Sequence, residues 1–155
     1  MAKKRDQIKM SDAEIASFLG HERVVNVSTI GRDGWPHVTA LWYVMRDGEP
    51  WIWTYRKSQK VKNLERDDRA TLLVESGFEY AELKGVMFKS RAHIEYDTEH
   101  VLSFGEELFA KYQGVEQVDD GMREALRAQA EKRVAIRFEP VETATWDHAK
   151  LGGTY

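Results

Sequence analysis

The feature that most constrains the fold is a run of three strand-like segments in the first third of the chain. The segments read RVVNVSTI, WPHVTALWYVM and PWIWTY, and the connections between them read GRDG and RDGE. β-branched and aromatic residues favour strands, while Gly and Asp in short connections favour tight reversals. Consecutive strands joined by such turns pair antiparallel. The run therefore predicts a β-meander.

The rest of the chain adds four helices and three strands. The first helix is SDAEIASFL, in which Ser11 and Glu14 form a capping box. Further helices are predicted at residues 59–66, 98–113 and 120–133, the last two from their amphipathic pattern. Further strands are predicted at residues 69–76, 80–96 and 134–146, with a bend or bulge expected at Gly85 or at Lys89 and Ser90.

The order of these elements indicates one mostly β or α+β domain. Six strands with early hairpins, one crossover helix and a helical excursion before the last strand predict an antiparallel β-barrel with peripheral helices. A length of 155 residues suits a single domain. Residues 1–10 are expected to be a mobile tail, and residues 145–155 form a polar C-terminal tail.

Composition excludes several classes of function. A net charge of −3 argues against a nucleic-acid partner. No apolar run approaches the roughly 20 residues of a membrane span, and MAKKRDQIK lacks the apolar region of a secretory signal. The absence of cysteine fits a cytoplasmic protein. The five histidines lack the spacing of metal ligands, so no metal is expected; they are His21, His37, His93, His100 and His148.

The stretch WTYRKSQKVKNLERDDR places cations where a helix begins. Ser58 is at the N-cap position, and Arg56, Lys57 and Lys60 surround it, although a helix N-terminus disfavours cations. A bound anion would resolve this conflict, because early helical N–H groups are unpaired and attract negative charge. Thr54, Ser58 and Lys60 would then hold a phosphate. The alternative is a loop of solvated charges with Ser58 as a plain cap.

The pattern Thr54-x-x-x-Ser58-x-Lys60, followed by VKNLERDDRATLLVE, resembles the pyridoxamine 5′-phosphate oxidase-like, flavin-binding split-barrel superfamily. The resemblance extends from Ala13 to the C-terminus. It implies a split β-barrel in which these three residues hold the cofactor phosphate. GRDGWPHVTALWYV is similar to the hairpin and second strand whose backbone faces the flavin ring. ATWDHAKLGG is most similar to the deazaflavin-dependent oxidoreductases related to actinobacterial split-barrel reductases.

The resemblance also bears on the cofactor and the assembly. The oxidases that give the superfamily its name resemble one another in an Arg-x-Val-Leu-Leu-Lys stretch that serves the flavin phosphate, and VTALWYVM has neither cation. Arg56 and Lys57 instead suit the phospholactyl-oligoglutamate tail of coenzyme F-420. The resemblance thus implies a homodimeric oxidoreductase that uses coenzyme F-420 on a small organic substrate. The alternatives are an FMN-binding flavoprotein and a non-enzymatic cofactor carrier.

Two aromatic residues are candidates for the wall against the cofactor ring. Trp42 and Tyr43 could present a flat apolar surface to it, with core or interface packing as the alternative. Hydride chemistry belongs to the cofactor, so no catalytic residue is assigned. Tyr43 and His148 are the candidates if a proton donor exists, because the resemblance implies that the C-terminal tail folds over the cofactor site.

Overall fold

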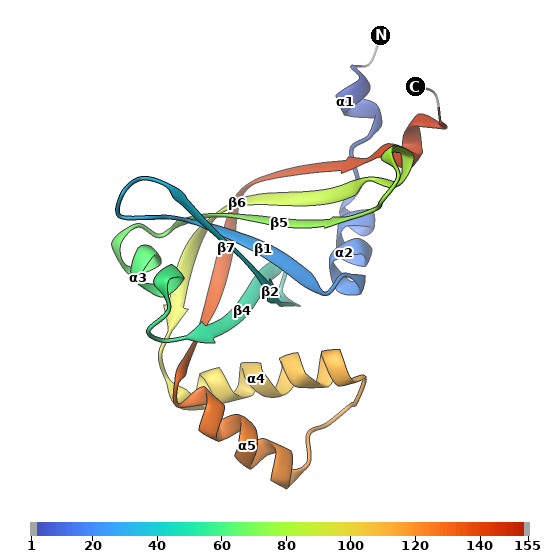
Figure 1. The fold of residues 1–155 in the computed structure, drawn as a ribbon. Coiled ribbons are helices and arrows are strands. Elements are labelled where there is room, and N and C mark those ends of the chain that lie inside the picture. Colours follow the sequence, from blue (N-terminus) through green and yellow to red (C-terminus); the bar gives the residue numbers. More distant parts are fainter. Residues whose placement is uncertain (1–2, 154–155) are drawn as a thin grey trace.

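A computed structural model describes residues 3–153, and it is an α+β split barrel built on one curled antiparallel sheet (Figure 1). The strand order is β2-β1-β5-β6-β7-β4-β3. The strands are β1 (Val24–Ile30), β2 (Pro36–Trp42), β3 (Val44–Arg46), β4 (Glu49–Tyr55), β5 (Arg69–Ser76), β6 (Lys84–Glu95) and β7 (Arg133–Asp147). The helices are α1 (Lys4–Gln7), α2 (Asp12–His21), α3 (Gln59–Arg66), α4 (Thr98–Gln113) and α5 (Asp120–Ala130), with 3-10 turns η1 (Tyr80–Glu82) and η2 (His148–Leu151). No helix within the described range is long and apolar enough to cross a membrane.

The sheet has seven strands where the sequence predicts six. The segment expected to be one strand is interrupted at Tyr43, because β2 pairs with β1 whereas β3 pairs with β4. The backbone N–H of Tyr43 donates to the Tyr112 hydroxyl, which fixes the break. Residues 80–82, expected to begin a strand, form η1 instead. The bulge predicted at Lys89 and Ser90 is confirmed by a register shift between them.

Both expected tails contain local structure within the described residues. Within the first ten residues, α1 forms, and Met10 is buried, with its backbone N–H donating to Thr145 Oγ1 at 3.0 Å. β7 extends to Asp147, and η2 follows directly. Residues 1–2 and 154–155 of the two expected tails lie outside the described residues.

The structure has two apolar cores. One fills the inside of the curled sheet and includes Val25, Leu72 and Phe138. The other lies under α4 and α5, which Figure 1 shows beneath β4, and includes Phe104 and Leu126. The second core anchors the carboxyl half of β4, so it fixes the place where α3 begins.

Gly105 provides a test of the second core. A Cβ atom there would lie 2.6 Å from Cζ3 of Trp53, so alanine must displace the indole ring. Gly105→Ala is expected to lower the free energy of unfolding by about 1–3 kcal/mol, although alanine favours helix. Thermal unfolding checks this. The control is Gly20→Ala, also helical, where no atom lies within 4 Å. A higher melting temperature for both variants would contradict this packing.

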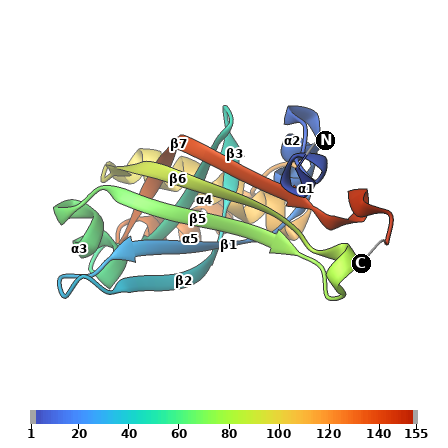
Figure 2. The same cartoon turned by 90° about the horizontal axis from the view of Figure 1, so that it is seen from above.

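One face of the sheet carries no helix. Figure 2 shows β7, β6, β5, β1 and β2 side by side, and no helix lies across β5, β6 or β1. Apolar side chains remain exposed on these strands: Val24 is 44% exposed, Val38 58% and Val141 69%. Along β1 and β2 such residues alternate with inward-facing ones, as the pleat requires.

Candidate functional site

The cations singled out in the sequence lie where β4 gives way to α3. Thr54 points inward and is 7% exposed, while Tyr55 points outward. The chain reverses at this point, because the backbone N–H of Ser58 donates to Tyr55 O at 3.0 Å. The helix then begins at Gln59 with Ser58 as its N-cap. The predicted strand, the helix and the N-cap position of Ser58 are confirmed, whereas the capping hydrogen bond expected of its side chain is not formed.

Lys60 is the central residue of the junction. Its ammonium donates to Thr54 Oγ1 at 3.1 Å, and the residue is only 8% exposed. No carboxylate within the described part of the chain pairs with it, and burial lowers its pKa. A buried ammonium without a counter-ion is costly. The geometry therefore provides a place for an anion.

Ser58 leaves its hydroxyl available to the same place. The residue has the extended backbone of an N-cap, but its side chain makes no capping bond to the helix. Its Oγ lies 3.5 Å from Thr54 Oγ1. Thr54, Ser58 and Lys60, predicted together from their spacing, thus lie together; we call them the phosphate cluster.

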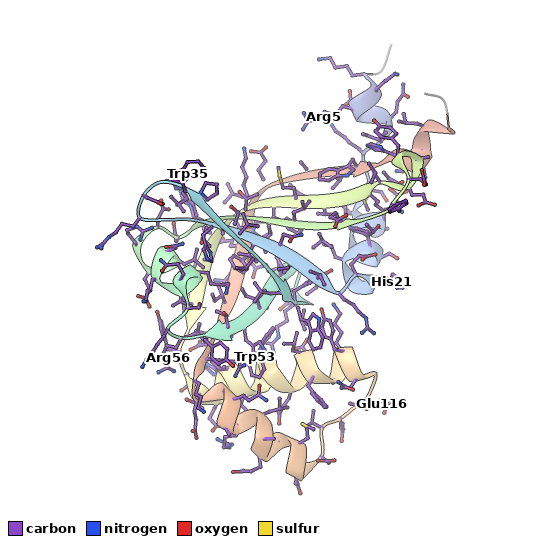
Figure 3. All side chains as sticks on the ribbon, viewed as in Figure 1. Arg5, His21, Trp35, Trp53, Arg56 and Glu116 are labelled. Atoms are coloured by element: carbon purple, nitrogen blue, oxygen red, sulfur yellow. The ribbon has the colours of Figure 1, made fainter. Side chains whose placement is uncertain are left out.

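The other two predicted cations, Arg56 and Lys57, differ in the contacts that their side chains make. The Arg56 guanidinium donates to Tyr96 O at 3.1 Å and lies 5.8 Å from the centre of the Tyr96 ring. Figure 3 labels Arg56 at the outer side of the turn. Lys57 is exposed and forms no ion pair with any residue between 3 and 153. Neither cation forms an ion pair among the described residues, but Arg56 is held by Tyr96 whereas Lys57 has no such contact.

The two aromatic candidates, Trp42 and Tyr43, differ in solvent exposure. Trp42 is 51% exposed and stacks on Tyr112 with ring centres 4.2 Å apart. Tyr43 has no exposed surface, and its hydroxyl donates to Leu19 O at 2.5 Å. Burial raises the Tyr43 pKa. Tyr43 therefore belongs to the core in this structure, and only Trp42 has a surface that a ring can contact.

The C-terminal tail lies away from the phosphate cluster within one chain. Figure 1 shows η2 and α3 at opposite ends of the sheet. His148 Nδ1 lies 3.0 Å from Tyr80 O, and the two rings are 4.5 Å apart. A tail that covers a cofactor site would therefore have to cover that of a partner subunit. Among residues 3–153, no group of three or more His, Asp or Glu side chains is placed to hold a metal.

Sequence reasoning missed a set of polar residues beside the cluster. Gln59 Nε2 donates to Asn63 Oδ1 at 2.9 Å, and Asn63 Nδ2 donates to Thr29 Oγ1 at 3.0 Å. Asn63 is fully buried. Asparagine on the apolar face of a short helix, four residues after Gln59, was the available signal.

Two further polar atoms on the inward face of β2 have no partner. Among residues 3–153, no hydrogen-bond partner reaches the buried Nδ1 of His37, which pairs with Thr29 across the sheet, or the buried Oγ1 of Thr39. Unsatisfied buried polar atoms cost about 1–3 kcal/mol each. These atoms therefore need a partner from solvent or from a ligand.

Comparison with known proteins places this geometry in a family. The pyridoxamine 5′-phosphate oxidase family profile matches residues 11–147. The chain belongs to this family. Flavin-type cofactors and oxidoreductase chemistry are typical of it, and the chain has its flavin-binding fold. No protein of curated function matches the chain.

Solved structures agree with this fold. A conserved hypothetical protein from Mycobacterium tuberculosis is 40% identical with a TM-score of 0.90, and the match covers 99% of this chain and 95% of that one. An F-420 reductase is 19% identical with a TM-score of 0.66, covering 83% and 94%. The heme storage protein from Vibrio cholerae is 16% identical with a TM-score of 0.66, covering 86% and 94%. At these lower identities the likeness concerns the fold.

The phosphate cluster fits the anionic end of a flavin-type cofactor. It combines a buried ammonium with two hydroxyl donors, and no carboxylate of the described chain pairs with that ammonium. A phosphate would satisfy the ammonium and both hydroxyls at once, with charge-assisted bonds stronger than neutral ones. The residues present therefore suit the group that the family implies.

Proposed function

We propose that this protein is an oxidoreductase that uses coenzyme F-420 for hydride transfer to or from a small organic substrate. The observation that carries the proposal is the unpaired ammonium of Lys60, buried beside Thr54 and Ser58 at the start of α3. When bound, the deazaflavin supplies the hydride chemistry. The residues of this chain bind it, orient its ring and exclude water.

Each group has a distinct role in this proposal. The phosphate cluster holds the cofactor phosphate, and Trp42 offers its exposed ring as part of the wall for the deazaflavin. Lys57, which directly precedes Ser58, is an exposed charge without an ion pair among the described residues. Arg56 attracts anions toward the same end while it remains bonded to Tyr96. No residue is assigned as catalytic.

Two observations favour coenzyme F-420 over FMN. The inward face of β2 carries His37, Thr39 and Leu41, so no arginine or lysine there adds to the binding of a flavin phosphate. Lys57 meanwhile has a charge that no described residue uses. FMN ends at its phosphate, whereas the oligoglutamate tail of coenzyme F-420 brings further carboxylates that such a charge attracts.

The test is a fluorescence titration of the purified protein with each cofactor at low and moderate salt. Coenzyme F-420 should bind more tightly than FMN, and salt should weaken its binding because exposed charge contacts are screened. Lys57→Gln should reduce the salt dependence. Tighter binding of FMN would assign the chain to the flavoproteins instead. Binding without turnover of reduced cofactor, with added acceptors, would indicate a carrier.

We further propose a cytoplasmic homodimer. The absence of cysteine suits a reducing compartment. The exposed valines on the bare face of the sheet would be buried against a second copy, and twofold pairs are the commonest assembly. A dimer would also allow the C-terminal tail of one subunit to reach the cofactor site of the other.

A further inference from the structure

A cavity of about 490 Å³ lies between the β1–β2 turn and the first turn of α3. We call it the hairpin-tip pocket. Its polar and aromatic lining comprises Arg32, Asp33, Trp35, His37, Gln59 and Asn63. Figure 3 labels Trp35 at the end of the hairpin, and the residue is 74% exposed. The volume is within the range of small-ligand sites.

The lining leaves particular groups unpaired. His37 Nδ1 is buried without a partner. Gln59 uses its Nε2 to bond Asn63, whereas its Oε1 accepts no hydrogen bond from the described residues. Arg32 has no ion pair within residues 3–153, and the neighbouring Asp33 accepts from the Trp35 backbone N–H through Oδ1 at 3.1 Å. The lining of the pocket thus includes a cation without an ion pair and an amide oxygen that accepts no hydrogen bond, both judged among residues 3–153.

The pocket adjoins the phosphate cluster through α3. Gln59 lies between Ser58 and Lys60 in the chain and lines the pocket. The exposed Trp42, proposed for the ring, lies at the carboxyl end of β2, whereas residues 31–37 lie at the other end. If the ring lies toward Trp42, whatever follows the phosphate is directed toward the hairpin tip.

We propose that the hairpin-tip pocket binds the first γ-glutamyl units of the cofactor tail. This inference rests on the proposed function, and it names a tail site that differs from Arg56 and Lys57. A γ-glutamyl unit carries a carboxylate, which complements the Arg32 guanidinium, and an amide N–H, which complements Gln59 Oε1. FMN has neither group beyond its phosphate.

The alternative binding surface for the tail, around Arg56 and Lys57, is less suitable than the pocket. On that side, Arg56 is already bonded to Tyr96 O, and Lys57 is exposed. A flexible lysine at an open surface gains little from one carboxylate. The pocket around Arg32 instead combines a charge, an amide and an aromatic surface.

The experiment compares two ligands that differ only in the tail. One is coenzyme F-420 with its oligoglutamate, and the other is the same deazaflavin ending at the phospholactyl group. The wild-type protein should prefer the first by about three- to tenfold at low salt. Arg32→Gln should abolish this preference without changing affinity for the ligand that lacks glutamate. Lys62→Gln, a control at an exposed lysine on α3, should retain most of the preference.

A second readout locates the contact without relying on affinity. The side-chain amide signals of Gln59 in a ¹⁵N spectrum should shift further with the tailed ligand than with the untailed one. Full tail preference in Arg32→Gln, or equal wild-type affinity for both ligands, would overturn this inference and leave the proposed function intact. Failure of both ligands to bind the wild-type protein would overturn the proposed function and this inference with it.

Discussion

Replacing Lys60 with methionine is expected to weaken cofactor binding about ten- to a hundredfold. A hydrogen bond to a charged group contributes about 1.5–3 kcal/mol, and each 1.4 kcal/mol is a factor of ten in affinity. This range applies to Lys60, because its ammonium is buried and has no carboxylate partner among the described residues. Methionine keeps most of the apolar stem, so the loss measures the charge. Fluorescence titration with coenzyme F-420 is the measurement.

The same substitution should not destabilise the cofactor-free protein. Burial lowers the Lys60 pKa, so the folded state disfavours the charged form. Lys60→Met should therefore raise the melting temperature slightly at pH values below the lowered pKa of Lys60. Its advantage should shrink as pH rises through the lowered pKa and vanish above the unfolded pKa of about 10.4, because lysine is then neutral in both states.

A lysine two positions along the helix supplies the control. Lys62 is exposed on α3, so Lys62→Met removes the same charge from the same helix without touching the cluster. It should change cofactor affinity about threefold at most at moderate salt. If Lys60→Met bound the cofactor normally and melted below the wild-type protein, Lys60 would be a structural residue and the phosphate assignment would be wrong.

The features predicted from the sequence are those that local chemistry decides. The capping box of Ser11 and Glu14, the helix after Ser58 and the spacing of the phosphate cluster each involve residues within six positions of one another. A strand followed by a capped helix places Thr54 and Lys60 side by side almost regardless of the rest of the fold. This is why the cluster forms as its spacing predicts.

The features that sequence reasoning missed depend on distant parts of the chain. Tyr43 is buried because the hydroxyl bonds to Leu19, and Arg56 is engaged because Tyr96, 40 residues away, offers its carbonyl. Asn63 bonds Thr29 across 34 residues. Alternation places such side chains inside or outside the sheet, but it does not identify their partners. The split between β2 and β3 has the same origin, since the two strands pair with different neighbours.

Val38→Asp is expected to convert the protein from a dimer to a monomer. Val38 is 58% exposed on β2, an edge strand, so an aspartate is tolerated by the isolated chain. In a twofold dimer through the bare face, the substitution acts twice and desolvates two carboxylates without partners. Each such group costs several kcal/mol, so the dissociation constant should rise at least about a hundredfold. Light scattering at micromolar concentration reports the change in mass.

The control for this variant carries the same substitution at the other pole of the molecule. Val115, 42% exposed after the end of α4, lies away from the bare face, so Val115→Asp should remain dimeric. Cofactor affinity is a second readout, because sites at the dimer seam should weaken when the subunits separate, whereas sites within one chain should not. A wild-type mass of one chain would contradict the dimer. If Val38→Asp remained dimeric, the interface would lie on another face of the protein. The proposal that the C-terminal tail of one subunit reaches the cofactor site of the other would then fail as well.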